Sequence, residues 1–242
     1  MEKKYKLTEE TINVNGKTLY RIEALMDFGG VKKGDKGGFI EKECNLSQRG
    51  DCWVYDNAQI YDDAMVCGNA RIFDNAKVYG YAKVFINANI YGNAQVYNNA
   101  KVFGNAEVRG NAHVYDDAEV YGNAKVYGYT MVYGDAEVCD NAKICDDAKV
   151  FDNAIAFDNA VVFGNAEVRG NAHVYDDAEV YGNARVFDNA RVFDNAEVYG
   201  NAQVCDDAEV YGNAKIYDNA FIYNNAKIYG YALVCDNTKL CD

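Results

Sequence analysis

The chain has 242 residues, of which 50% are hydrophobic, with no proline, 21 glycines, 21 tyrosines and a formal net charge of −13 at pH 7. This acidic balance argues against nucleic acids and anionic membranes as partners, because phosphate binding requires clustered Lys and Arg. No apolar run is long enough for a signal peptide or a membrane span, so we expect a cytoplasmic protein.

Residues 1–51 predict an N-terminal hairpin and a capping coil. Two strand-like runs, residues 11–14 and 17–22, flank Asn15-Gly16, which is a strong hairpin signal. An irregular glycine-rich coil follows, in which we expect Ile40, Leu46 and Cys52 to continue a column of smaller alanine side chains. Such a segment would plug the first coil of a repeat array, since terminal repeats are normally atypical.

Residues 52–242 form an uninterrupted array of six-residue units, Ala-x-Val-aromatic-Gly/Asp-Asn. Every sixth residue from Val54 to Leu240 is aliphatic except the small Ala156, and from Ala58 to Thr238 the residue two places earlier in each unit is Ala or, twice, Thr. Alternation predicts a short strand with Ala and Val on one face, and Gly/Asp-Asn predicts a turn. So short a strand cannot bury its face alone, so the units must stack into an all-β parallel β-helix, a β-solenoid.

The run VYGNAK at residues 120–125 resembles the hexapeptide repeat of left-handed parallel β-helix proteins. The resemblance implies a left-handed helix with three hexapeptides per coil. The best-known members of that superfamily are acyltransferases, which typically place a histidine base and CoA at a cleft between the subunits of a trimer. This chain departs from the pattern in one position, which is Tyr or Phe in 24 of 32 units. Residues 33–41 and 45–54 resemble the N-terminal part of YdcK-like proteins of bacteria and phages.

With three units per coil, residues 18 apart in the sequence would stack on one another. The aromatic position then forms three ladders, which we interpret as self-stacking or, alternatively, as a surface for a partner, a glycan or another copy of the chain. Two arginines interrupt the ladders, and each is expected in a cation–π sandwich, with anion binding as the alternative. These are Arg109 between Tyr91 and Tyr127, and Arg169 between Phe151 and Phe187.

Acidic residues occupy one turn position in four successive coils, with a fifth beside them: Asp140, Asp158, Asp176, Asp194 and Asp177. Turn chemistry by itself favours Asp at such positions, and a Ca²⁺ site or a basic partner is the alternative hypothesis. No two of the eight cysteines are 18 residues apart. We therefore expect reduced, packing cysteines and no zinc cluster.

His113 and His173 are the only histidines, and they lie in two copies of one block, because residues 102–124 are identical to residues 162–184. The shift of 60 residues is three coils and one unit, so the copies would face different sides of a three-sided column. A site assembled from neighbouring coils would not survive that rotation. We favour surface histidines over a general base, which needs a positioned partner and a pocket.

The sequence thus favours a non-catalytic spacer, scaffold or self-assembling rod that needs no cofactor. Self-association is expected through the aromatic ladders or the last coil, where residues 240–242 stop within a unit. One alternative is an acyltransferase that uses acyl-CoA, with His113 or His173 as base. Another is a glycan- or metal-binding module.

Overall fold

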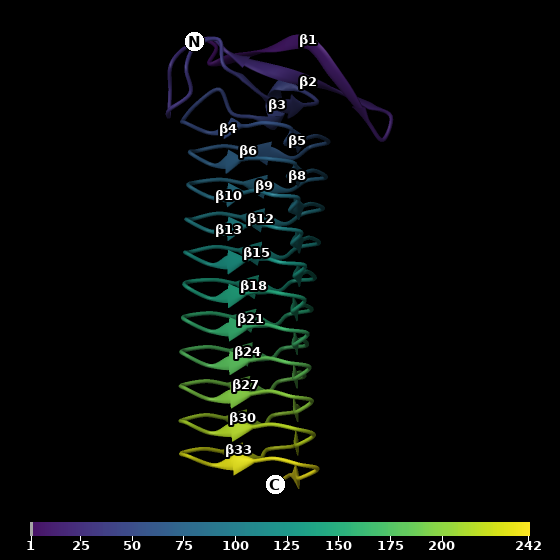
Figure 1. Cartoon of the computed structure of the whole chain (residues 1–242), viewed down its shortest axis with the longest axis vertical. Coiled ribbons are helices and arrows are strands. Elements are labelled where there is room, and N and C mark those ends of the chain that lie inside the picture. Colours follow the sequence, from purple (N-terminus) through teal and green to yellow (C-terminus); the bar gives the residue numbers. More distant parts are fainter. Residues whose placement is uncertain (1) are drawn as a thin grey trace.

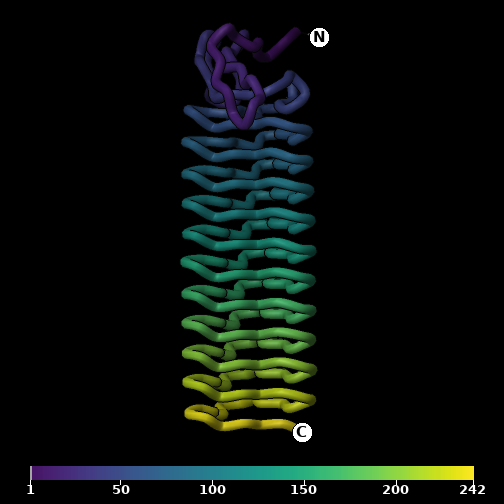
Figure 2. The backbone as a smooth tube through the Cα atoms, turned by 90° about the vertical axis from the view of Figure 1, so that its right-hand side faces the viewer, coloured from purple at the N-terminus to yellow at the C-terminus, as the bar shows by residue number. Residues whose placement is uncertain are grey.

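The computed structural model describes residues 2–242, which form an all-β column (Figure 1). Thirty-two two-residue strands, β4 to β35, belong to three parallel sheets that run along the column. Each unit contributes one strand and one bend, and the chain passes through the three sheets in turn, with a corner between each pair. Successive coils stack along the column (Figure 2). This confirms the predicted parallel β-solenoid.

Sheet 1 has 14 strands, and its solenoid strands are β5 (Gln59–Ile60), β8 (Lys77–Val78), β11 (Gln95–Val96), β14 (His113–Val114), β17 (Met131–Val132), β20 (Lys149–Val150), β23 (Glu167–Val168), β26 (Arg185–Val186), β29 (Gln203–Val204), β32 (Phe221–Ile222) and β35 (Lys239–Leu240). Sheet 2 has 11 strands, namely β4 (Trp53–Val54), β7 (Arg71–Ile72), β10 (Asn89–Ile90), β13 (Glu107–Val108), β16 (Lys125–Val126), β19 (Lys143–Ile144), β22 (Val161–Val162), β25 (Glu179–Val180), β28 (Glu197–Val198), β31 (Lys215–Ile216) and β34 (Leu233–Val234). Sheet 3 has ten, namely β6 (Met65–Val66), β9 (Lys83–Val84), β12 (Lys101–Val102), β15 (Glu119–Val120), β18 (Glu137–Val138), β21 (Ile155–Ala156), β24 (His173–Val174), β27 (Arg191–Val192), β30 (Glu209–Val210) and β33 (Lys227–Ile228).

Strand pairing joins residues 18 apart, as in the pairing of Gln95 with His113 and of His113 with Met131. Three units therefore complete one coil, as the resemblance to hexapeptide-repeat proteins implies. The left-handedness that the same resemblance implies stays a prediction. The first corner leads from sheet 2 to sheet 1, the second from sheet 1 to sheet 3, and the third from sheet 3 to sheet 2.

The interior consists of the Ala and Val positions of the repeat, which are buried over nearly the whole column. Backbone N–H groups donate to carbonyl oxygens of the next coil toward the C-terminus, as Lys101 N does to Ala118 O at 2.9 Å. A proline would remove one such donor, which accounts for the absence of proline from the chain. The small Ala side chains let the three sheets meet closely around a narrow core.

The N-terminal segment closes one end of the column (Figure 1). Strands β1 (Tyr5–Val14) and β2 (Lys17–Ala24) pair antiparallel, and Asn15 and Gly16 take positive φ values of 52° and 82° in the turn between them. This confirms the predicted hairpin. Strand β2 also pairs with β3 (Lys36–Ile40), and a short 3₁₀ turn, η1 (Glu43–Asn45), follows.

Trp53 is the central side chain of this closure. It is 1% exposed, and its ring meets Tyr5 and Phe28 edge-on, with centroid distances of 6.1 and 5.3 Å. Because β3 pairs in parallel with β5, sheet 1 continues from the cap into the repeats. The division into residues 1–51 and 52–242 stays a prediction.

The structure corrects one part of the predicted cap. Ile40 pairs with Ile60 and Leu46 bridges to Val66, so both continue the Val column and not the Ala column. These pairs are 20 residues apart because the loop before Trp53 contains two additional residues. Cys52, which directly precedes the Trp53–Arg71 pair, keeps the 18-residue register and stands below Ala70, as predicted.

The first residue of each bend has a positive φ, between 52° and 88° in the repeats. Asp, Asn and Gly reach this region at low cost, which explains why they fill the position. Ile86, with a φ of 64° and 46% exposure, is a β-branched exception. All eight cysteines are free, as expected. Within residues 2–242, no helix is long and apolar enough to cross a membrane.

Candidate functional site

The second residue of each bend, the Asn position, forms hydrogen-bonded ladders along the corners. On the third corner, each side-chain amide donates to the residue 18 places later, in one series from Asn69 to Asp177 with distances of 3.0–3.2 Å. An ionised Asp accepts but cannot donate, so a ladder ends where Asp177 replaces Asn. The sequence suggested a turn preference alone and missed this second role of Asn.

The aromatic position forms the expected stacks on the outer face. The longest runs along sheet 1 from Tyr61 to Phe151, with six nearly parallel rings at centroid distances of 4.8–4.9 Å. Another runs along sheet 3 from Phe157 to Tyr229 at 4.8–5.5 Å. Most of these rings are partly buried by their neighbours, which supports the interpretation of the ladders as self-stacking.

The two arginines of the ladders differ in their contacts. The guanidinium of Arg109 lies 4.6 Å from the Tyr127 ring centroid and 5.9 Å from that of Tyr91, which confirms the sandwich. Its Nε is buried and has no hydrogen-bond partner within residues 2–242. Arg169 stacks on Phe187 at 4.6 Å, and that is the single ring contact found for it in the described chain, so its predicted sandwich is half formed. These contacts are structural, and anion binding by either residue stays a prediction.

The acidic column occupies the third corner. Asp140, Asp158, Asp176 and Asp194 all have φ values of 55–59°, as the bend requires. Two of the carboxylates also bond to the next coil, since Asp176 Oδ2 accepts the amide N–H of Asp194 at 3.3 Å, and Asp194 Oδ2 accepts that of Gly212 at 3.0 Å. Asp177 lies beside them and ends the Asn ladder. This geometry gives the column a structural role in the bends, and Ca²⁺ binding stays a prediction.

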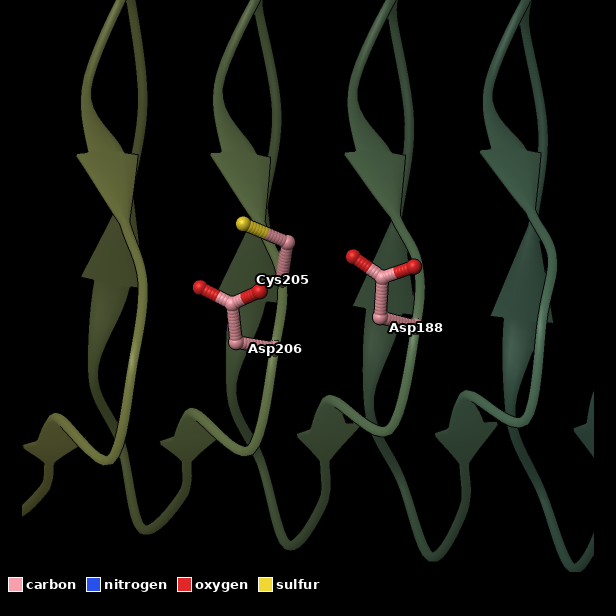
Figure 3. A group of neighbouring side chains, drawn as sticks. All are labelled: Asp188, Cys205 and Asp206. Atoms are coloured by element: carbon pink, nitrogen blue, oxygen red, sulfur yellow. The ribbon is translucent and has the colours of Figure 1, made fainter.

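A different group brings possible metal ligands within 4.8 Å of one another, namely Asp188, Cys205 and Asp206 (Figure 3). Burial raises the pKa of the Cys205 thiol to about 12, and the two nearby carboxylates add to the effect. A thiol binds metal as the thiolate, so this one is a poor ligand near neutral pH. Asp206 Oδ2 also accepts the amide N–H of Asn224 at 2.9 Å. Asp218, Cys235 and Asp236 repeat the arrangement in a later part of the same array.

The two histidines lie on different sheets, His113 in β14 of sheet 1 and His173 in β24 of sheet 3, as the 60-residue shift predicts. Each imidazole packs edge-on against a ring, Tyr97 at 6.1 Å and Phe157 at 6.4 Å. Burial lowers the pKa of both, and for His173 the charge of Arg191 lowers it further. Across residues 2–242, neither imidazole has a hydrogen-bond partner that would orient it as a base.

Two surface recesses lie beside tyrosines that replace Asn in the repeat. The Tyr129 groove has a volume of about 600 Å³ and is lined by Asn111, His113, Tyr129, Met131, Asp147, Lys149, Asn165 and Glu167. The Tyr81 groove, also about 600 Å³, is lined by Asp63, Met65, Tyr81, Lys83, Asn99, Lys101, Asp117, Glu119, Asp135 and Glu137. Each runs parallel to the axis between the Asn position and the outward strand position of successive coils. Of the predicted site residues, His113 alone lines either groove.

Sequence reasoning missed these grooves. Tyr-Gly-Tyr occurs at residues 79–81, 127–129 and 229–231 and puts a large ring where the unit normally has Asn, and the first two of these border a groove. Tyr81 and Tyr129 are 63% and 65% exposed, and within the described chain neither stacks on another ring. They are thus unlike the ladder tyrosines, which are mostly half-buried.

Comparison with known proteins places this repeat near one bacterial relative. Residues 58–70 match the family model described as the YdcK beta solenoid repeat. A stretch of 42 residues is 45% identical to the uncharacterized acetyltransferase YdcK of Escherichia coli strain K12. That stretch is 17% of this chain and spans 13% of the length of the relative. The matches confirm the resemblance to YdcK-type solenoid repeats.

Proposed function

We propose that this protein is a rigid, non-catalytic rod that serves as a spacer or scaffold. The observation that carries the proposal is that outward side chains are partnered along the axis, from coil to coil. The Asn ladders and stacked rings act in this way, and so do ion pairs such as Lys101–Glu119 at 2.6 Å and Lys215–Glu197 at 2.8 Å. The outward side chains therefore hold neighbouring coils together.

Regular stacking gives the rod a fixed length. Coils repeat every ~4.8 Å, so the array extends roughly 50 Å. We also propose a left-handed coil, from the resemblance to hexapeptide-repeat proteins, and a cytoplasmic location, in keeping with eight free cysteines. Self-association through the ring ladders or the last coil belongs to the same proposal, and light scattering over a range of concentrations measures it.

Small-angle X-ray scattering on the full chain and on a deletion of residues 191–208 tests the rod. Removing 18 residues preserves every face, so we expect a folded protein that is shorter by about one coil spacing, ~4.8 Å. A deletion of residues 191–199 is the matched control, because nine residues leave half a unit at the junction, which disturbs the stacking there and should lower the stability of the column. An 18-residue deletion that unfolds the protein, or scattering from a flexible chain, contradicts the proposal.

A second candidate function is acyl transfer, which the printed name of the bacterial relative suggests. His113 would be its base, because it lines the Tyr129 groove and burial lowers its pKa, which keeps the imidazole neutral near pH 7. Thermal unfolding with acetyl-CoA separates the two functions. Saturable stabilisation that His113→Ala abolishes, together with acetyl transfer to an acceptor, would support the enzyme and contradict the non-catalytic rod. A Ca²⁺-dependent shift abolished by Asp176→Asn would instead support the metal-binding alternative.

A further inference from the structure

We propose that the Tyr129 groove and the Tyr81 groove are binding sites for an extended, neutral, β-1,4-linked oligosaccharide. The inference goes beyond the rod, since a rod needs no ligand. It rests on a break in the repeat, on a natural comparison within the chain and on the chemistry of the groove walls.

The repeat is broken at a structural cost at Tyr129. Its neighbours in the Asn position are Asn111 in the preceding coil and Asp147 in the following coil. An Asn between them could accept from Asn111 and donate to Asp147, which would extend the ladder in which Asn93 donates to Asn111 at 3.1 Å. Tyr129 makes neither bond and leaves its ring 65% exposed. Departures from a local rule without structural gain are expected at functional sites.

The duplicated block supplies a comparison without Tyr129. Sixty residues later, the equivalent position is Asn189, and the ladder there is intact, with bonds of 3.0 Å from Asn171 and to Asp207. The equivalent recess is about 290 Å³. It contains ion pairs of Glu209 with Arg191 and Lys227, at 3.8 and 2.9 Å. The groove of about 600 Å³ therefore accompanies the residues that follow the first copy, Tyr129 and Met131 among them, and not the block itself.

The walls of the Tyr129 groove suit a sugar. A pyranose has an apolar face of C–H groups, which packs on aromatic rings, and an edge of hydroxyls that both donate and accept. Tyr129 and the neighbouring Met131 supply the apolar surface. Asn111, Asn165 and Glu167 supply planar amide and carboxylate groups, and Lys149, which pairs with Glu167 at 3.7 Å, supplies a donor. The groove carries one Lys against two carboxylates, which gives little attraction for a polyanion or polycation.

The shape of the groove selects an extended chain. Its lining residues come from four successive coils at 18-residue intervals, so the groove is straight and roughly 14 Å long at ~4.8 Å per coil. A β-1,4-linked pyranose chain is a nearly straight ribbon, whereas an α-1,4-linked chain curves.

The Tyr81 groove has the same placement beside its strands on another face, but it is more acidic, with five carboxylates against two lysines. It lies along sheet 3, where the Tyr129 groove lies along sheet 1, and Tyr81 likewise replaces Asn before an outward Lys83. Asn99 continues from it to Asp117 at 3.0 Å, so the ladder begins only after the tyrosine. Each chain therefore has two sites, which face different directions.

Titration of the full chain with cellohexaose, followed by NMR or calorimetry, tests the proposal. We expect saturable binding at two sites, Tyr129→Asn and Tyr81→Asn each to remove one, and the double variant to bind at least about tenfold more weakly. Asn is the usual residue of that position, so these variants should fold. Tyr231→Asn is the matched control, because Tyr231 occupies the same position and is 85% exposed but lines neither groove, and its binding should be unchanged.

Maltohexaose, which is α-1,4-linked, and spermine are the ligand controls. Weaker binding of maltohexaose by at least about tenfold supports the extended ligand. Absence of cellohexaose binding, equal binding by the double variant, or binding of spermine in place of cellohexaose would each overturn the proposal. None of these results bears on the rod, which scattering tests separately.

Discussion

Residues 102–124 and 162–184 have one sequence and two surroundings. Both fold into the same strands and bends, and in both a tyrosine hydroxyl donates to a glutamate of the next coil, Tyr121 to Glu137 at 2.8 Å and Tyr181 to Glu197 at 3.0 Å. Yet the first copy lines a groove of about 600 Å³ through Asn111 and His113, whereas the equivalent recess of about 290 Å³ is lined by residues between 189 and 227, beyond the second copy. In a solenoid, a surface is determined by residues 18 apart more than by the local sequence.

The largest expected difference between the copies concerns the core. Val114 stacks between Val96 and Val132, whereas Val174 stacks between Ala156 and Val192. Val114→Ala removes two buried methyl groups and should lower the free energy of unfolding by about 2 kcal/mol. Val174→Ala should cost more, because it puts two alanines in contact and enlarges the cavity. Chemical denaturation measures both, and an equal loss would show that the core around Ala156 collapses.

The arginines give the next difference. Arg109 stacks on two rings and Arg169 on one. Cation–π contacts at partly exposed sites contribute about 0.5–1 kcal/mol each. Arg109→Ala should therefore destabilise the protein by about 1–2 kcal/mol and Arg169→Ala by about half as much, in urea denaturation at constant salt. If the order is reversed, ring contacts do not decide the stability of these positions.

The architecture could be predicted from the sequence because every unit carries the same pattern of a short strand followed by a bend. The alternation of Ala and Val gave the strand faces, Asn15-Gly16 gave the hairpin, and the spacing of Arg109 from Tyr91 and Tyr127 gave its sandwich. All of these depend on local geometry or on one period. The same spacing predicted a sandwich for Arg169, where one of the two ring contacts is present, so the period fixes the stacking partners more firmly than the side-chain contacts.

The rest depended on contacts that the period alone does not specify. The two additional residues before Trp53 shifted Ile40 and Leu46 into the Val column, because loop length sets register where the repeat is absent. The grooves were missed because Tyr129 resembles the ladder tyrosines in composition, although it stands in the Asn position. Attention to the type of position, and not to the type of residue, would have found it.

Positions 129 and 189 follow the two copies at equivalent places, and exchanging their residues is expected to change the free energy of unfolding in opposite directions. Tyr129→Asn completes a ladder between Asn111 and Asp147 and should raise the free energy of unfolding by up to about 1 kcal/mol, since exposed amide bonds contribute modestly. Asn189→Tyr breaks two bonds of 3.0 Å and should lower it by a similar amount. Thermal and urea denaturation of both variants measure the effect. A loss of stability in Tyr129→Asn would show that the tyrosine has a structural role.

The smallest expected effect is a pH dependence that the two histidines share. Burial lowers the pKa of both below the ordinary value of 6.5, so the folded state resists protonation that the unfolded state accepts. The resulting loss of folding stability is absent well above pH 6.5 and appears as the pH falls through 6.5. It is complete below the pKa that each histidine has in the folded state. Outward neighbours in adjacent strands are Gln95 and Met131 for His113, and Ile155 and Arg191 for His173.

Replacement by Gln isolates this contribution from that of the many carboxylates. Between pH 7.5 and 5.5, His113→Gln and His173→Gln should each lose less stability than the unaltered chain. His173→Gln should preserve more than His113→Gln, because Arg191 adds repulsion to burial for His173 alone. Urea denaturation at the two pH values measures the differences, with His173→Gln/Arg191→Gln as the control. Equal behaviour of the two single variants would mean that burial acts alone and that Arg191 is too well solvated to distinguish the copies.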